Sequence, residues 1–389
     1  MRSRSIFKVG GAALAVAALG LTFAVPASAD IAPNASDIVG VGSDTVQNMA
    51  NFMADGDTSF SSLGVNSTVS KNRVFSFDAT PDANDRAGYL QGSTALVPKP
   101  LTPTIVLRAG HNPVQRPNGS GKGIDALIAD TGNQVNFVRM SSLPSVANQN
   151  AVTGGLRVIK ISTDNLKLAS ATTTNVPAAG LDAATLAKIY TCTTGFTDWS
   201  SLGGSAGVII PQAPDAINSG TGKTFFADLK AASGSSTYTY GSCVQTVEEN
   251  DPTSITTARS AIGNLLDPAD AIAPFSEGRF TLYASSYFHD STLPFPTATV
   301  LTSGIKLYSG ATNYLKNRGL FIVFRDSDKN STVQWQPGNS LNWVQALFMN
   351  SNPLAPPYVS TTDGQAAIAS GGGVPTYVNC GVGATVLSC

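Results

Sequence analysis

Charged side chains are scarce in this chain, and histidine is nearly absent. Only 13% of the 389 residues are Asp, Glu, Lys or Arg, and only two are histidine. A hydrolase triad needs a general base, usually histidine, and both His111 and His289 fall in segments that we interpret as loops. Ser303 and Lys306 have the SxxK spacing of some acylating enzymes, but no SDN or KTG motif accompanies them. We therefore expect a protein that is not an enzyme and that needs no cofactor.

Long apolar runs are absent after the first 29 residues. Three basic residues precede an apolar run over 9–25, and residues 27–29 have the small-x-small form of a signal-peptidase site. No later run approaches the roughly 20 residues that cross a bilayer. We expect residues 1–29 to be a signal peptide, and the mature chain to be periplasmic or extracellular, without insertion in a membrane.

Cysteine is also sparse, with four residues, all at position 192 or later. None lies in the leader, so no lipid anchor is evident, and no CxxC spacing suggests a metal site. An oxidising compartment favours disulfides, for which three pairings are possible. We favour Cys192–Cys243 and Cys380–Cys389, because the second pair closes a short loop that contains glycine.

Basic residues are too few for a nucleic-acid partner. The leader contributes three of the 24 Lys and Arg and none of the 25 Asp and Glu, which leaves 21 basic against 25 acidic residues. About 360 mature residues can bury a large core and usually divide into two lobes or domains. Two lobes imply a cleft between them.

What the sequence does contain is a recurring turn of glycine and small hydroxyl residues that opens a helix. Residues 38–47 (IVGVGSDTVQ) give a short apolar strand, a glycine turn and then a helix with apolar residues at i, i+3, i+4 and i+7 from Val46, which Gly56 would end. A helix start with flanking glycines can hold an anion on its backbone N–H groups. The alternative is an ordinary capping box, in which Asp44 caps the helix and Gln47 reaches back.

Two further turns of this type lie at 119–121 and 219–221, and Arg139 falls at the end of a strand between them. Three such helix starts and one guanidinium form a set of donors that suits an oxyanion. A nucleotide P-loop is excluded, because the glycine it needs five residues before Gly-Lys is Ile217 in one case and Arg116 in the other.

Strand and helix patterns alternate along the chain, which predicts an α/β architecture with mainly parallel sheets. We interpret strand 156–161 as the first crossing between lobes and strand 320–325 as the return. The expected division is a signal peptide over 1–29, lobe 1 over 30–155, lobe 2 over 156–319, and a return segment of lobe 1 with a disulfide-closed tail over 320–389.

Several motifs together resemble a known family. IVGVGSDT, RPNGSGKGI, NFVRMSS, LDAATLAKIYTCTTGFTDW, SGTGKTFFADL and EENDPTSI…AIAPFSEGRF occur in the order seen in substrate-binding proteins similar to the phosphate receptor of the phosphate-specific ABC transporter. The resemblance implies a two-lobed type II periplasmic-binding-protein fold that closes on its ligand like a hinge. It also implies a small inorganic oxyanion as ligand, phosphate by first choice, an ABC permease as partner, and a monomer.

The resemblance places ligand contacts in each of the three glycine turns. With the strand ends added, the expected ligand-binding residues are Ser43, Asp44, Thr45, Ser120, Gly121, Arg139, Ser141, Ser219, Gly220 and Thr221. Where the family has an arginine before its Ser-Gly-Thr motif this chain has Asp215, and where it has an acceptor aspartate this chain has Ser142. We therefore expect Asp44, rather than Asp215, to accept a hydrogen bond from the protonated oxygen of phosphate.

Two other interpretations remain open at this point. The first is a secreted binding protein on the same scaffold, with a different ligand or a surface partner and no transporter. The second is a hydrolase, for which adjacent Glu248 and Glu249 are candidate carboxylates. Adjacent residues on an extended segment point apart, so we interpret this pair as the solvated lead-in to a helix that Asp251 caps and Pro252 begins.

Overall fold

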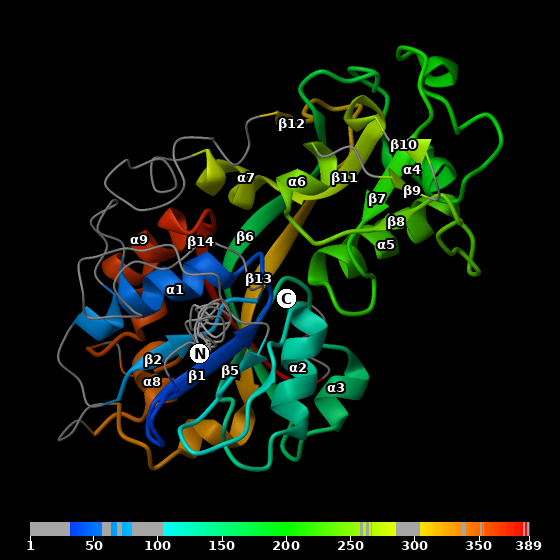
Figure 1. Cartoon of the computed structure of the whole chain (residues 1–389). Helices are drawn as coiled ribbons and strands as arrows, with labels where there is room; N and C mark the ends of the chain where they lie inside the picture. Colours follow the sequence, from blue (N-terminus) through cyan, green and yellow to red (C-terminus); the bar gives the residue numbers. More distant parts are fainter. Residues whose placement is uncertain are drawn as a thin grey trace, which may run out of the picture.

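The computed structural model describes residues 32–56, 64–67, 72–79, 104–256, 260–261, 264–265, 267–284, 304–335, 340–350, 352, 354–383, 386 and 389. The expected signal peptide lies outside these residues. The described chain forms two lobes, joined by the long strands β6 (Leu156–Ala171) and β13 (Leu315–Arg325) (Figure 1). The two-lobed α/β architecture expected from the sequence is therefore confirmed, whereas the exact lobe boundaries stay a prediction.

Lobe 1 is built on strands β1, β2 and β5, with helices on both faces of the sheet. Its elements are β1 (Ile38–Gly42), α1 (Gln47–Asp55), β2 (Val74–Ser76), β3 (Thr104–Ile105), β4 (Val114–Gln115), α2 (Gly119–Ala129), β5 (Phe137–Met140), α3 (Val146–Asn150), α8 (Trp343–Leu347), α9 (Thr362–Ser370) and β14 (Val374–Val382). The helices α1 and α9 pack together on one face, and α2 packs on β1 and β5.

Lobe 2 repeats this plan on a smaller scale around β7 and β11. Its elements are α4 (Ala183–Tyr190), β7 (Ile210–Ala213), α5 (Gly220–Ser233), β8 (Gln245–Thr246), α6 (Pro252–Thr256), β9 (Ser260–Ala261), β10 (Asn264–Leu265), β11 (Ala271–Ser276) and β12 (Ile305–Leu307), with α7 (Glu277–Tyr283) following β11 at the junction of the lobes. Its core gathers aromatic side chains such as Tyr190, Trp199 and Phe225.

One large sheet runs through both lobes in the order β2-β1-β5-β13-β6-β11-β7-β8, with β12 and β14 also paired to β6. Within the part of this sheet that belongs to each lobe the neighbouring strands are parallel, as the alternating pattern predicts, whereas the separate pairs β3–β4 and β9–β10 are antiparallel. The pairs that involve β6 or β13 are antiparallel. Two strands that carry the chain out of lobe 1 and back must run in opposite directions, so the crossing is antiparallel by necessity.

The crossing strands are longer than the sequence pattern predicts. β6 and β13 pair from Leu156 opposite Arg325 to Lys167 opposite Leu315, with one irregularity between Leu320 and Phe321. The apolar pattern covers only the lobe-1 half of each strand. The polar residues in the lobe-2 half of each strand stay in the sheet because they pair with the other crossing strand there. The two strands thus form a continuous connection under the cleft.

Helix α1 begins at Gln47 and ends at Gly56, as expected, but it is buried on all sides rather than on one face. Its N-cap is Val46, with no side-chain hydrogen bond, and Gln47 Oε1 instead accepts from Ala79 N at 2.7 Å. The capping-box alternative is therefore wrong. Asp44 is free of a capping role and is available to the cleft.

Both expected disulfides, Cys192–Cys243 and Cys380–Cys389, are confirmed. The expected cap of α6 is confirmed too, since Thr253 N donates to Asp251 Oδ1 at 2.9 Å. In the part of the chain that the structure describes, no helix is both long enough and apolar enough to cross a membrane.

Candidate functional site

The starts of α2 and α5 meet across the boundary between the lobes. Gly119 opens α2 with φ 83°, and a Cβ at this position would lie 2.6 Å from the carbonyl oxygen of Asn218, just before α5. Gly121 N donates to the same carbonyl at 2.7 Å. Only glycine allows the two backbones to approach so closely. The starts of α2 and α5, which the sequence indicated as separate anion sites, therefore lie at a single site.

Three serine hydroxyls from lobe 1 cluster at this junction. Ser43 Oγ donates to Ser141 Oγ at 3.1 Å, and Ser120 Oγ lies 3.4 Å from Ser141 Oγ. Ser141 N also donates to Ser120 Oγ at 3.0 Å. Gly220, the first residue of α5, closes the cluster: a Cβ there would lie 2.5 Å from Ser120 Oγ and closer still to Ser141 Oγ. The hydroxyls of Ser120 and Ser141 thus face the N-terminus of α5, and Ser43 is linked to it through Ser141.

A second group of hydroxyls surrounds the carboxylate of Glu249. Thr45 Oγ1 of lobe 1 lies 3.2 Å from Thr221 Oγ1 of lobe 2 and 3.5 Å from Glu249 Oε1. Ser219, the N-cap of α5, donates its hydroxyl to Glu249 Oε2 and accepts from Gly222 N at 2.9 Å. Glu249 is only 4% exposed. The start of α5 therefore already holds a carboxylate.

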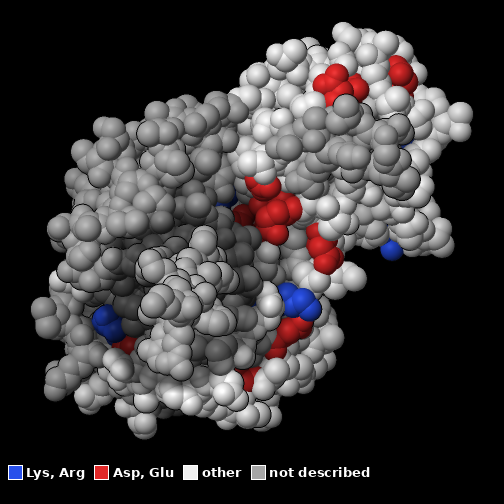
Figure 2. Space-filling model, viewed as in Figure 1, with Lys and Arg blue, Asp and Glu red and all other residues white. Residues whose placement is uncertain are grey.

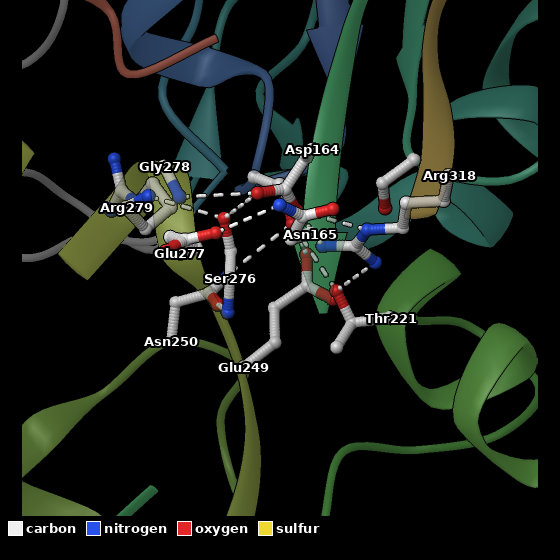
Figure 3. Close-up of polar contacts among 12 residues, drawn as sticks. Asp164, Asn165, Thr221, Glu249, Asn250, Ser276, Glu277, Gly278, Arg279 and Arg318 are labelled. Atoms are coloured by element: carbon white, nitrogen blue, oxygen red, sulfur yellow. Dashed lines mark hydrogen bonds and ion pairs between the residues drawn. The ribbon is translucent and has the colours of Figure 1, made fainter. Parts of the chain in front are cut away.

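An ion pair between the two crossing strands lies beside these hydroxyls (Figure 3). Arg318 on β13 stands opposite Asp164 on β6 and donates to Asp164 Oδ2 from Nε and Nη2, at 3.0 and 2.8 Å. The Nη1 of Arg318 donates to Thr221 Oγ1 at 2.8 Å. Asp164 Oδ1 accepts from Ser276 Oγ and Gly278 N, at 2.9 and 3.1 Å, at the start of α7. One buried pair thus links both crossing strands to α5 and α7.

A second buried ion pair joins lobe 1 to the junction. Arg279 on α7 donates to Asp44 Oδ1 at 3.1 Å, and both side chains are almost completely buried. Asn250 Nδ2 donates to Asp44 Oδ2 at 2.9 Å and to Thr45 Oγ1 at 3.1 Å. Asp44 therefore has both carboxylate oxygens occupied by groups that lie outside lobe 1.

The charges at the junction do not balance. The carboxylates of Asp44, Asp164 and Glu249 face the guanidinium groups of Arg279 and Arg318, and all five residues are buried. Burial, and then the charge of Asp44, raise the pKa of the Glu249 carboxyl, while the hydrogen bond from Ser219 and the charge of Arg318 act against this rise. A negative charge on Glu249 is therefore poorly stabilised by its surroundings.

A cavity of about 530 Å³ opens next to Glu249, between the lobes. Its lining residues are Asn118, Gly119, Lys122, Pro214, Asp215, Asn218, Ser219, Thr246, Val247, Glu248 and Glu249. Acidic side chains gather where the two lobes meet on the face shown in Figure 2. Glu248 is one of the lining carboxylates, held by Asn118 Nδ2 at 3.1 Å from each oxygen. The cavity is therefore polar and contains more acidic than basic groups.

The structure brings most of the expected ligand-binding residues together. Those at the junction are Ser43, Asp44, Thr45, Ser120, Gly121, Ser141, Ser219, Gly220 and Thr221. Arg139 lies against the first glycine turn from inside lobe 1: its guanidinium donates to Gly42 O and Ser43 O, at 3.2 and 3.3 Å, and to Ser76 Oγ and Phe77 O, both at 2.6 Å. Arg139 therefore supports the backbone of the turn that carries Ser43.

The structure also describes Asp215 and Ser142, the two residues that depart from the family pattern. Asp215 lies in the turn before α5 and accepts from Ile217 N at 2.7 Å and Asn218 Nδ2 at 2.6 Å. Burial alone would raise the pKa of Asp215, but these hydrogen bonds lower it overall. Ser142 Oγ is buried and has no hydrogen-bond partner among the described residues. Asp215 is therefore occupied within its own turn, whereas Ser142 is not.

The sequence analysis missed Asp164, Asn250, Arg279 and Arg318, and it interpreted Glu249 as solvated, which is wrong. Only Glu248 of the pair is exposed, because adjacent residues on an extended segment point apart. One signal could have identified Asp164 and Arg318. Each is a charged residue within three residues of an expected strand, in a chain that has few charges.

Of the two histidines, one lies in the part of the chain that the structure describes. His111 is exposed, and His289 and Ser303 lie outside the described residues. Within the described ranges no group of three His, Cys, Asp or Glu side chains could hold a metal ion.

No protein-family model and no curated protein matches the chain. Similar solved structures include a phosphate-binding protein from Stenotrophomonas maltophilia, with 12% identity, a TM-score of 0.44, and coverage of 91% of this chain and 98% of that chain. Another is an ABC-type phosphate transport receptor from Vibrio cholerae, with 13% identity, a TM-score of 0.41, and coverage of 77% and 90%. PstS from Borrelia burgdorferi has 14% identity, a TM-score of 0.35, and coverage of 76% and 88%. At these values the likeness concerns the fold, and the function must be argued from the site itself.

Proposed function

We propose that this protein is a binding protein that holds a small oxyanion between its lobes, with phosphate as first choice. One observation supports this most strongly: hydroxyls from both lobes converge on the N-terminus of α5. Ser43, Ser120 and Ser141 approach from one side, and Thr45 and Thr221 meet at 3.2 Å on the other. Hydroxyls on opposite lobes that share one ligand would hold the lobes closed.

The backbone adds donors to this set. The amides of Gly220 and Thr221 lie in the first turn of α5, where no intrahelical acceptor exists. They carry the positive end of the helix dipole, which favours an anion. Arg318 reaches the same place through Thr221 at 2.8 Å. Tetrahedral oxyanions accept many hydrogen bonds at once, which matches this dense group of donors.

Binding, rather than catalysis, is the role that this geometry supports. The hydroxyls at the junction contact one another, Asn250, a carboxylate or Arg318, and none of the hydrogen bonds described for them involves a histidine. A serine or threonine nucleophile needs an adjacent general base that is itself held in place. The carboxylate of Glu249 accepts from Ser219, but Ser219 is also the cap of α5, which fixes its hydroxyl in a structural role.

Export and delivery to an ABC permease complete the proposal. They rest on the expected signal peptide and on the motif resemblance described above. The solved structures similar to this fold include phosphate-binding and phosphate-transport proteins. The cleft between two lobes, with strands β6 and β13 as the connection, suits capture by hinge closure.

The acidic cavity favours a second candidate, a secreted protein that binds another solute and serves no transporter. Glu248 and Asp215 line a space of about 530 Å³, and Lys122 is the only lysine or arginine that lines it. Carboxylates accept hydrogen bonds from hydroxyl or ammonium groups. A larger solute with such groups would use the cavity, which inorganic phosphate alone leaves mostly empty.

Native mass spectrometry of the purified protein, followed by calorimetric titration with phosphate, distinguishes the two candidates. A bound mass equal to phosphate, and binding that Thr221→Ala weakens but Thr237→Ala does not, would support the oxyanion site; Thr237 is an exposed threonine of the same lobe. No heat with phosphate or sulfate, together with a larger retained solute, would instead support the second candidate.

A further inference from the structure

Glu249 occupies the place that the proposed function gives to the oxyanion. Its Oε2 accepts from the hydroxyl of Ser219, the N-cap of α5, and its Oε1 lies 3.5 Å from Thr45 Oγ1. Thr221 also donates toward this carboxylate, and Arg318 attracts it. A carboxylate is itself an oxyanion. The contacts that it makes here are those expected of a ligand oxygen.

These hydroxyls cannot serve two acceptors at once. Each serine or threonine hydroxyl has a single O–H to donate, and Ser219 gives its own to Glu249. Its oxygen meanwhile accepts from Gly222 N at 2.9 Å, which fixes the direction of the donated hydrogen. An anion at the start of α5 therefore receives the Ser219 hydrogen bond only when Glu249 gives it up.

We propose that Glu249 is a built-in competitor for the oxyanion site, so that an anion binds as Glu249 takes up a proton and turns away from the start of α5. This inference rests on the proposed function, because it concerns the same hydroxyls. The cavity between the lobes offers the space for the movement, since Glu249 and Ser219 both line it. Glu249 thus determines when the site is open.

The surrounding charges favour exchange of this kind. Asp44 from the turn before α1 repels Glu249, and Arg318 from β13 attracts it. Each of these neighbours is already paired, Asp44 with Arg279 on α7 and Arg318 with Asp164 on β6.

On the segment of Glu249 itself, Glu248 and Asp251 add further negative charge. An oxyanion that entered while Glu249 stayed ionised would add to an excess of negative charge in a buried place. Uptake of one proton by Glu249 offsets one charge of the entering anion. Anion binding is therefore coupled to proton uptake, and affinity rises as the pH falls.

Sulfate is the first probe for this coupling, because it stays a dianion from pH 5.5 to pH 8 and any pH dependence then comes from the protein. Phosphate is titrated in parallel. With wild type we expect sulfate affinity to rise at least ~10-fold from pH 8 to pH 5.5. With Glu249→Gln we expect both anions to bind at least ~10-fold more tightly than wild type at pH 8. We expect the pH dependence of sulfate affinity to be smaller than in wild type but not zero, because burial raises the pKa of the neighbouring Glu248 to about 7.

Glu277→Gln is the matched control. It makes the same change in a carboxylate of the same junction, where Glu277 bonds Asn165 and Lys167 rather than the hydroxyls of the site (Figure 3). We expect this variant to keep the wild-type affinity and the wild-type pH dependence.

A second measurement needs no variant. Titration of wild type at pH 7 in two buffers with different ionisation enthalpies gives the number of protons taken up with sulfate, which we expect to lie clearly above zero and toward one.

The outcomes separate the two proposals. If wild type binds phosphate or sulfate but Glu249→Gln binds no more tightly, or if no proton is taken up with sulfate, Glu249 is not a competitor and the proposed function stands alone. If folded wild type and folded Glu249→Gln bind neither anion at any pH, the oxyanion function fails and the inference with it. If only the variant binds at pH 8, both proposals are supported.

Discussion

The two walls of the cleft differ in the hydrogen-bond partners of their polar side chains. On the lobe-1 wall, Ser43, Ser120 and Ser141 bond mainly to one another, at 3.0 to 3.4 Å. The opposite wall consists of the start of α5 together with Arg318 and Asp164 on the crossing strands, and this ion pair is locked by several charged hydrogen bonds. Neutral hydroxyls exchange partners at little cost, whereas a buried charge that loses its partner is strongly destabilised. The hydroxyl wall is thus suited to binding, and the charged wall to holding the junction in shape.

Breaking the charged wall should have the largest effect. Replacing Arg318 with methionine leaves Asp164 buried without its cation, so we expect the free energy of unfolding to fall by about 3–5 kcal/mol. Lys316→Met is the matched control, because the Lys316–Asp228 pair is partly exposed and should contribute at most about 1 kcal/mol. Denaturant unfolding measures both. Equal losses for the two variants would contradict the distinction between the walls.

The hydroxyl wall was predictable from the sequence, and the charged wall was not. A glycine turn followed by apolar residues at helical spacing is a local signal, and it correctly placed the starts of α1, α2 and α5. Arg318 and Asp164 are 154 residues apart in the chain. Their pairing depends on the register of β6 and β13, which apolar patterns detect only over the lobe-1 half of each strand.

The direction in which a side chain points was the second feature that the sequence could not predict. The sequence placed Arg139 near the end of a strand, but whether it faces the cleft or the interior depends on which face of β5 it occupies. In the structure its guanidinium bonds Ser76 Oγ and Phe77 O inside lobe 1. For Glu249, the sequence correctly indicated that two adjacent carboxylates point apart, but it could not tell which one would be buried.

Separating the two walls tests whether their contact matters for binding. Gly220→Ala places a methyl group against Ser120 Oγ and Ser141 Oγ, where a Cβ has no space. We expect the closed form to be disfavoured by about 2–3 kcal/mol, which is roughly 30- to 150-fold in anion affinity. The measurements are calorimetric titration and small-angle X-ray scattering, which should show a larger radius of gyration.

Gly132→Ala provides the control for that substitution. A Cβ at Gly132 would meet only the flexible end of Gln134, at 3.3 Å. This variant should bind and scatter like wild type. If Gly220→Ala also does so, the start of α5 does not form part of a closing site.

Removing one hydroxyl from each wall sharpens the comparison. A buried hydrogen bond to a charged ligand oxygen is worth about 1.5–3 kcal/mol. Ser120→Ala and Thr221→Ala should each weaken phosphate binding at least ~10-fold. Thr221 also accepts from Arg318 at 2.8 Å, so Thr221→Ala should lower the free energy of unfolding as well, whereas Ser120→Ala should change it less. Unchanged titrations for both variants would place the anion elsewhere.

The smallest effect that we expect concerns the selectivity between phosphate and sulfate. It involves Asp44, a lobe-1 carboxylate that pairs with Arg279 on α7. Phosphate near neutral pH keeps a proton that sulfate lacks, so a carboxylate can accept a hydrogen bond from phosphate but repels sulfate. Asp44 lies at the junction, with Oδ1 toward Arg279 and Oδ2 toward Asn250. Asp44→Asn removes the acceptor's charge and leaves Arg279 without its carboxylate, and both changes favour the fully charged anion. We expect wild type to prefer phosphate, and the variant to narrow that preference by about threefold or more. Paired titrations with phosphate and sulfate give the ratio directly, and an unchanged ratio would mean that Asp44 serves the ion pair with Arg279 and does not select the ligand.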